Sequence, residues 1–202
     1  MSARIDICNF ALSFLGEARI TSLDDDHARA QVMSDFYYIA KDACLEDANW
    51  TFAMKRFTPA ESATAPAFGW SYAYPIPSDI LRVTAVLKGW QSNSVIPASW
   101  DEFPEEKKSA HVIEGNEILS NDNPIYCYGI RKMPDEGGYS PLFVETFGYK
   151  LAYLAASPLS ASTTRADRAL GLYAANLKKA KTRDSMQNST RRMRSNILRY
   201  SR

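Results

Sequence analysis

The stretch CLEDANWTFAMKR, residues 44–56, marks the point at which the chain changes character. Up to Ala48 it has the polar flanks of a helix end, and from Trp50 it becomes aromatic and apolar before closing on Lys55 and Arg56. Trp50 and Phe52 fall on the same side of an extended run, so both are predicted to pin a first strand onto the preceding helix. We interpret this stretch as the junction between a helical part and a β-rich part.

Two helices are predicted before the junction. The first should run from about Ala3 to Leu15, and the second from a capping aspartate to about Asp47. The candidate caps are three consecutive carboxylates, which suit the positive end of a helix dipole: Asp24, Asp25 and Asp26. The buried stripes at helical spacing are expected to be Ile5, Cys8, Leu12 and Leu15 in the first helix, and Val32, Phe36, Ile39 and Ala43 in the second.

From residue 50 to about residue 132, Gly and Pro interrupt short β-prone runs. The run HVIEGNEILS predicts a hairpin with Gly115 and Asn116 at its tip. Residues 58–68 and 98–109 are predicted to be loops.

Two more helices are predicted after the β-rich run. Ser140 followed by Pro141 is typical of a helix start, and this helix should end near Ala156. The last helix should begin at Ser162 or Thr163. Its buried face is expected to be Leu170, Tyr173, Leu177 and Ala180.

The order of elements predicts an α+β protein: a four-helix bundle with a β-rich insertion between helices two and three, and an extended basic C-terminal arm. The corresponding divisions are residues 1–49 and 139–188 for the two halves of the bundle, 50–138 for the insertion and 189–202 for the arm.

Charge is distributed unevenly along a chain whose net charge is only +1. Residues 165–202 hold eleven Lys and Arg against two Asp, a net of +9, so residues 1–164 carry a net of −8. Such a basic end is typical of a segment that binds nucleic acid or an acidic protein surface. No apolar run is long enough to span a bilayer, so no membrane partner is expected.

The residues that usually carry chemistry are few and scattered. His27 follows three aspartates at a helix start, and His111 begins a short strand, without a ligand or nucleophile motif near either. Three distant cysteines form no CxxC pair, and the glycines form no GxGxxG or Walker loop. No catalytic residue, metal or cofactor is therefore predicted.

Several fragments, in this order, resemble the head-to-tail adaptors of short-tailed bacteriophages, also called tail tubular protein A. The fragments are NFALSFLGEARITSL (9–23), ANWTFAMKR (48–56), YAYPIPSDILRV (72–83), HVIEGNEIL (111–119), IYCYGIRK (125–132) and SPLFVETFGYKLAYLAA (140–156). Each fragment alone is weak support for the resemblance, and it is the order of the fragments along the chain that makes the resemblance specific. The resemblance covers most of the chain up to about residue 185.

The resemblance implies a structural protein of the virion tail, made in the host cytoplasm, and not an enzyme. It implies a homo-oligomeric ring, typically a dodecamer, between the portal protein and the tail nozzle, with tail fibres or spikes as further partners. DNA would pass through the lumen without sequence-specific binding. By position alone, the C-terminal arm is expected to dock on the portal through Arg191, Arg192, Met193, Arg194, Ile197, Leu198, Arg199 and Tyr200.

A closed ring needs two different complementary faces on each subunit, and exposed aromatic residues suit such contacts. The candidates for contacts between subunits or with the nozzle are Trp70, Tyr72, Tyr74, Trp90, Trp100 and Phe103. The alternative for each is that it fills the small core of the insertion.

Two other functions remain open from the sequence. One is a nucleic-acid-binding module whose phosphate contacts are Lys178, Lys179, Lys181, Arg183, Arg191, Arg192 and Arg194. The other is a hydrolase that uses Glu114 and Glu117, the carboxylates flanking the predicted hairpin tip.

Overall fold

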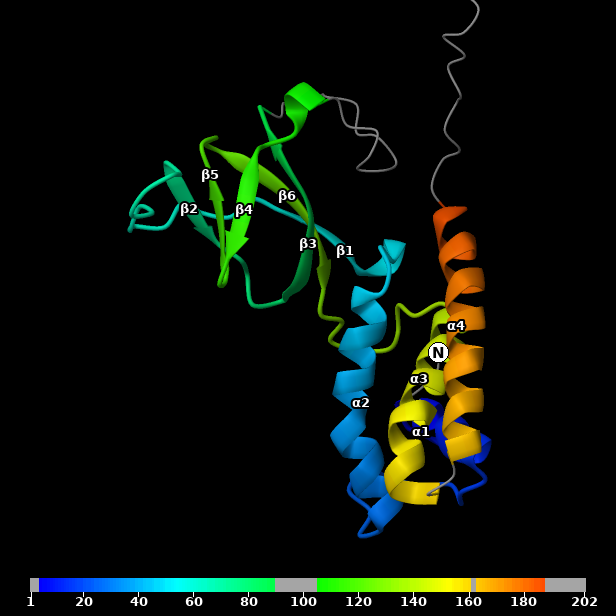
Figure 1. Cartoon of the computed structure of the whole chain (residues 1–202). Helices are drawn as coiled ribbons and strands as arrows, with labels where there is room; N and C mark the ends of the chain where they lie inside the picture. Colours follow the sequence, from blue (N-terminus) through cyan, green and yellow to red (C-terminus); the bar gives the residue numbers. More distant parts are fainter. Residues whose placement is uncertain (1–3, 90–104, 161–162, 188–202) are drawn as a thin grey trace, which may run out of the picture.

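The computed structural model describes residues 4–89, 105–160 and 163–187 (Figure 1). Within these residues the protein belongs to the mixed α+β class, as predicted, with four α-helices and two small antiparallel sheets. The helices are α1 (Arg4–Leu15), α2 (Ala28–Glu46), α3 (Pro141–Ser160) and α4 (Thr163–Ser185). The strands are β1 (Met54–Phe57), β2 (Tyr72–Pro75), β3 (Ile80–Lys88), β4 (His111–Glu114), β5 (Glu117–Ser120) and β6 (Ile125–Arg131).

Helix α3 packs against α1, α2 and α4, and it lies between α2 and α4 in Figure 1. The core that these helices share is built largely from aromatic and small side chains. Phe143 of α3 contacts Trp50 edge-on, with ring centroids 4.9 Å apart, and Phe147 contacts Tyr37 in the same way at 5.1 Å. Trp50, which follows α2, is therefore part of the helical core.

The six strands lie between α2 and α3 along the chain and form two sheets of three strands, in the orders β1-β6-β3 and β2-β5-β4. Their shared core takes residues from both sheets: Tyr74, Val86, Ile118, Ile125 and Cys127. We call residues 54–131 the β region. The predicted hairpin is present, because β4 pairs with β5 across Gly115 and Asn116, and Gly115 has the positive φ of 58° that favours glycine.

The start of α2 differs from the prediction. His27 is the N-cap residue, and no side chain caps the helix. Asp25 instead closes the preceding turn, where its carboxylate accepts hydrogen bonds from the N–H groups of Thr21 at 2.9 Å and Ser22 at 3.1 Å. These bonds, that of Ser22 foremost, lower the pKa of Asp25.

The predicted stripes of α2 and α4 are each partly wrong. Ile39 is 59% exposed, and the buried side of α2 instead carries Met33, Tyr37 and Cys44. Leu170 of α4 is exposed, whereas Tyr173 and Ala180 are buried as predicted. In α2 the buried face is rotated from the predicted one by about one residue, whereas in α4 only Leu170 departs from the predicted face.

Helix α3 begins as predicted, because the Ser140 hydroxyl accepts a hydrogen bond from the N–H of Phe143 at 3.2 Å. It continues past Ala156 to Ser160, with Pro158 inside it. A proline in the last turn removes a single N–H donor, so the helix need not end before it.

Candidate assembly interface

The stretch CLEDANWTFAMKR, residues 44–56, is where the chain crosses from α2 into the β region. Residues Thr51–Ala53 form a 3-10 turn, so Trp50 and Phe52 do not share an extended run as predicted. The Trp50 side chain nevertheless anchors this crossing, because it is fully buried and its indole N–H donates to the carbonyl of Cys44 at 2.8 Å. Its ring also stacks on that of Phe52, with centroids 5.9 Å apart.

Helix α4 fixes the same crossing through Asp184. Both carboxylate oxygens bind Thr51: one accepts from the backbone N–H and the other from the hydroxyl, each at 2.8 Å. Asp184 is only 5% exposed, so the two bonds compensate much of the cost of burying its charge. Close by, the Tyr173 hydroxyl donates to the carboxylate of Asp47. The first crossing is thus bonded to α4 at two points.

A second set of polar contacts fixes the return crossing, between β6 and α3. The buried Lys41 ammonium of α2 donates to the carbonyl of Met133 at 2.9 Å, and burial lowers the pKa of this lysine. The Tyr37 hydroxyl donates to the Glu136 carboxylate at 2.8 Å, and Arg4 of α1 pairs with the same carboxylate at 3.5 Å. The β region is therefore tied to the helices where the chain leaves them and where it returns.

These polar anchors were not predicted from the sequence. Lys41, Glu136 and Asp184 are charged residues in stretches where solvent exposure is the usual expectation. The only available signal was position, since Lys41 falls one turn after Tyr37 and Asp184 one turn after Ala180 on the sides that are buried.

The residues weighed for catalysis do not converge in the part of the chain that the structure describes. His27 is the N-cap residue of α2, in the helical part of the molecule. His111 lies in β4, where its Nδ1 contacts the Ser109 carbonyl at 2.9 Å. Glu114 and Glu117 pair across the hairpin, with Glu114 exposed. No group of three or more potential metal ligands occurs among the described residues.

The three cysteines are buried and form no disulfide. Burial raises the pKa of each thiol, those of Cys8, Cys44 and Cys127, to about 12. A thiol that stays protonated at neutral pH is a poor nucleophile, so these cysteines behave as small apolar core residues.

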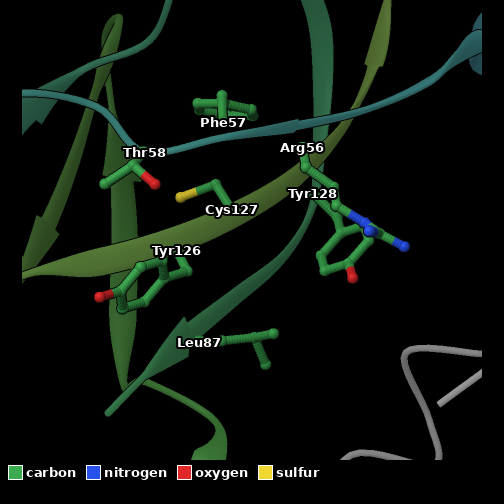
Figure 2. Close-up of a pocket in the computed structure, with 7 residues that line it drawn as sticks. All are labelled: Arg56, Phe57, Thr58, Leu87, Tyr126, Cys127 and Tyr128. Carbon is green, nitrogen blue, oxygen red and sulfur yellow. The ribbon is translucent and has the colours of Figure 1, made fainter. Parts of the chain in front are cut away.

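A depression of about 260 Å³ lies beside strands β1, β3 and β6 (Figure 2). Its lining residues are Arg56, Phe57, Thr58, Leu87, Tyr126, Cys127 and Tyr128. The Arg56 guanidinium lies over the Tyr128 ring, 5.3 Å from its centroid. The lining described here has no carboxylate or imidazole, so it suits a side chain of a partner better than a proton-transfer reaction.

The predicted contact aromatics fall into three groups. Trp70 and Tyr72 are half-buried, so part of each ring remains accessible. Tyr74 is 1% exposed and its hydroxyl donates to the carbonyl of Asp122 at 2.9 Å, so it belongs to the core of the β region and has little surface for a partner. Trp90, Trp100 and Phe103 lie outside the described residues, as do all the arm residues from Arg191 to Tyr200.

Other large apolar side chains are exposed where the sequence did not predict contacts. They lie on α2 (Tyr38 and Ile39), on α4 (Leu170), on the edge strand β4 (Val112 and Ile113) and in the loop before β2 (Phe68, 88% exposed). An apolar edge strand and apolar helix faces are typical of surfaces that a partner covers.

The basic residues of α4 are placed together. Lys178, Lys179, Lys181 and Arg183 are all exposed in the last two turns, immediately before the arm. None of the four forms an ion pair with another described residue. This end of α4 therefore presents a positive surface.

Comparison with known proteins adds no family. No protein-family model matches the chain, and no curated protein matches it. Among the described helices, none is both long and apolar enough to cross a bilayer.

Proposed function

We propose that the four helices form a bundle carrying the β region as an insertion, and that the protein is a ring-forming adaptor between a phage portal and the tail nozzle. In this proposal the ring is a dodecamer that lines part of the DNA ejection channel. Tail fibres or spikes, where the phage has them, attach around this ring. The proposal comes from the resemblance in sequence, and the anchored crossings and the basic end of α4 support it.

The observation that carries the proposal is the pair of anchored crossings. Asp184 bonds the first crossing to α4, and Lys41 bonds the second to α2. A connector must hold the face that meets one partner at a fixed angle to the face that meets the other. Buried hydrogen bonds at both crossings oppose a change in that angle, because breaking either would leave a buried charged group without its hydrogen-bond partner.

The arm, residues 189–202, is proposed to dock on the portal. It holds five arginines and no acidic residue, and it follows the exposed basic end of α4. An acidic groove on the portal would complement this charge, and the apolar residues Ile197 and Leu198 would fill pockets within it.

A truncation tests the docking. The chain ending at residue 188 should bind the portal ring of the same phage more weakly than the full chain, as measured by co-sedimentation. A matched control replaces residues 189–202 by a Gly/Ser segment of equal length, and it should bind as weakly as the truncated chain. Equal binding by all three proteins would show that the arm does not dock.

The exposed basic end of α4 favours nucleic-acid binding as the second candidate function. If Lys178, Lys179, Lys181 and Arg183 grip phosphates, the isolated protein should bind duplex DNA with an affinity that falls steeply with salt. The adaptor proposal expects no such binding at physiological salt, since its channel must release DNA.

A further inference from the structure

The outward face of α2 combines apolar and acidic side chains in one stripe. Asp35, Ile39, Asp42 and Glu46 recur at intervals of three and four residues, and Tyr38 lies beside them. Ile39 is 59% exposed and Tyr38 is 50% exposed, so two neighbouring large apolar side chains face solvent in the middle of the helix. None of the three carboxylates forms an ion pair with another described residue.

The outward face of α4 carries small and basic side chains, in contrast to the large apolar and acidic ones of α2. Gly171, Ala174 and Ala175 are exposed and form a flat stretch of small side chains, next to the exposed Leu170. A Cβ added at Gly171 would meet no atom within 4 Å, so this stretch is open to close approach by another helix. The lysines at positions 178 and 181 follow along the same face.

The two faces match in register. Glu46 lies two turns after Ile39, and Lys181 lies two turns after Ala174. With the helices parallel and Ile39 set against Ala174, Asp42 comes opposite Lys178 and Glu46 opposite Lys181. Ile39 then meets small side chains, and two of the three carboxylates, Asp42 and Glu46, each meet an ammonium group, whereas Asp35 comes opposite Leu170.

The arrangement of the helices allows this pairing between two copies but not within one. Helices α2 and α4 lie on opposite sides of α3, and both run in the same direction, from the bottom to the top of Figure 1. A rotation about an axis roughly parallel to them brings α2 of one copy against α4 of the next and keeps them parallel. Such a contact uses two different faces and repeats around a ring.

We infer that the partner of the α2 face is the α4 face of a second copy of this chain, in a head-to-tail contact centred on Ile39 and Ala174. This contact rests on the proposed ring and names the surfaces that build it. It also gives Lys178 and Lys181 a role in assembly, while Lys179 and Arg183 remain on the flank of the helix.

Cross-linking tests the contact directly. The double variant Ile39→Cys with Ala174→Cys, mixed under oxidising conditions at high concentration with and without the portal ring, should give a ladder of disulfide-linked oligomers. The native cysteines are buried and leave a low background. The matched control, Ser13→Cys with Ala174→Cys, moves the first thiol to an exposed position on α1 and should give no ladder.

Charge reversal adds a second measurement. Glu46→Lys and Lys181→Glu should each reduce the ladder of the double-cysteine protein, and the two reversals together should restore it. Both residues are exposed, so neither change should prevent folding.

The outcomes separate this contact from the proposed function. A ladder without binding to the portal would support the contact and contradict the adaptor function. A portal-bound ring without a ladder would overturn the contact and leave the adaptor function standing. Absence of the ladder both with and without the portal overturns the contact in every case.

Discussion

At the scale of single residues, Asp184 joins α4 to the junction through both of its carboxylate oxygens. Asp184→Ala should lower the free energy of unfolding by about 1–3 kcal/mol, because the backbone N–H of Thr51 would lose its acceptor. Asp167→Ala, which removes an exposed carboxylate from the same helix, should change it by less than about 0.5 kcal/mol. Urea unfolding of both variants measures the difference, and equal losses would mean that Asp184 does not anchor the junction.

The buried thiols predict a dependence of stability on pH. Burial raises the pKa of Cys8, Cys44 and Cys127 from 9.0 to about 12. The contribution of these protonated thiols to the free energy of unfolding is therefore complete below pH 9. It is lost as the pH rises from 9 towards 12, because the thiols of the unfolded chain release their protons at a lower pH than those of the folded chain. Urea unfolding at pH 8 and pH 10 should give the lower free energy at pH 10.

A labelling experiment checks the same burial. A thiol reagent at pH 8 should leave the folded protein unmodified and should modify all three cysteines in urea. Rapid modification of any of them in the folded protein would contradict the burial on which the pH prediction depends.

At the scale of elements, two helical glycines give opposite predictions for the same substitution. A Cβ on Gly148 of α3 would lie 2.3 Å from the Phe10 ring of α1, whereas one on Gly171 of α4 would meet nothing within 4 Å. Gly148→Ala should therefore destabilise the protein by about 1–3 kcal/mol as the two helices are pushed apart. Gly171→Ala should stabilise it by up to about 1 kcal/mol, since alanine is the better helix former.

Thermal unfolding of the two glycine variants measures both signs in one experiment. A shift in the same direction for both would show that the close packing of α1 on α3 does not control the effect.

The individual helices and turns differ in how well the sequence predicts them. Turn and cap residues are local signals, so the hairpin at Gly115 and the start of α3 at Ser140 were both predicted. Helix α2 contains the run FYYIA, residues 36–40, which puts apolar side chains on every face. Periodicity cannot choose the buried face of such a helix, and only packing against Phe147 of α3 selects Tyr37 over Ile39.

Contacts between distant segments were harder to predict than elements. Thr51 and Asp184 are separated by most of the chain, and neither belongs to a motif that names the other. The exposed stripe on α2 is not evident from the sequence for a related reason, because helical spacing places Ile39 on the predicted buried face. Its exposure became evident only once the neighbours of α2 were known.

At the scale of the whole molecule, the β region has a hydrophobic cluster of its own, and it also contributes Ile130 of β6 to the core of the helices, to which the two anchored crossings join it (Figure 1). A molecule whose two parts are joined at both crossings can present one part to a portal and the other to a nozzle, as the adaptor proposal requires. The exposed apolar residues on α2, α4 and β4 would then be covered in the assembly.

In the proposed function, many copies of this chain assemble as a ring on a portal. Light scattering coupled to size-exclusion chromatography, applied to the purified chain with and without the portal ring of the same phage, measures this most directly. The proposed ring predicts a complex whose mass exceeds that of the portal by about twelve copies of the chain, as the resemblance to the adaptors implies. A portal that elutes at its own mass beside free chain would contradict it.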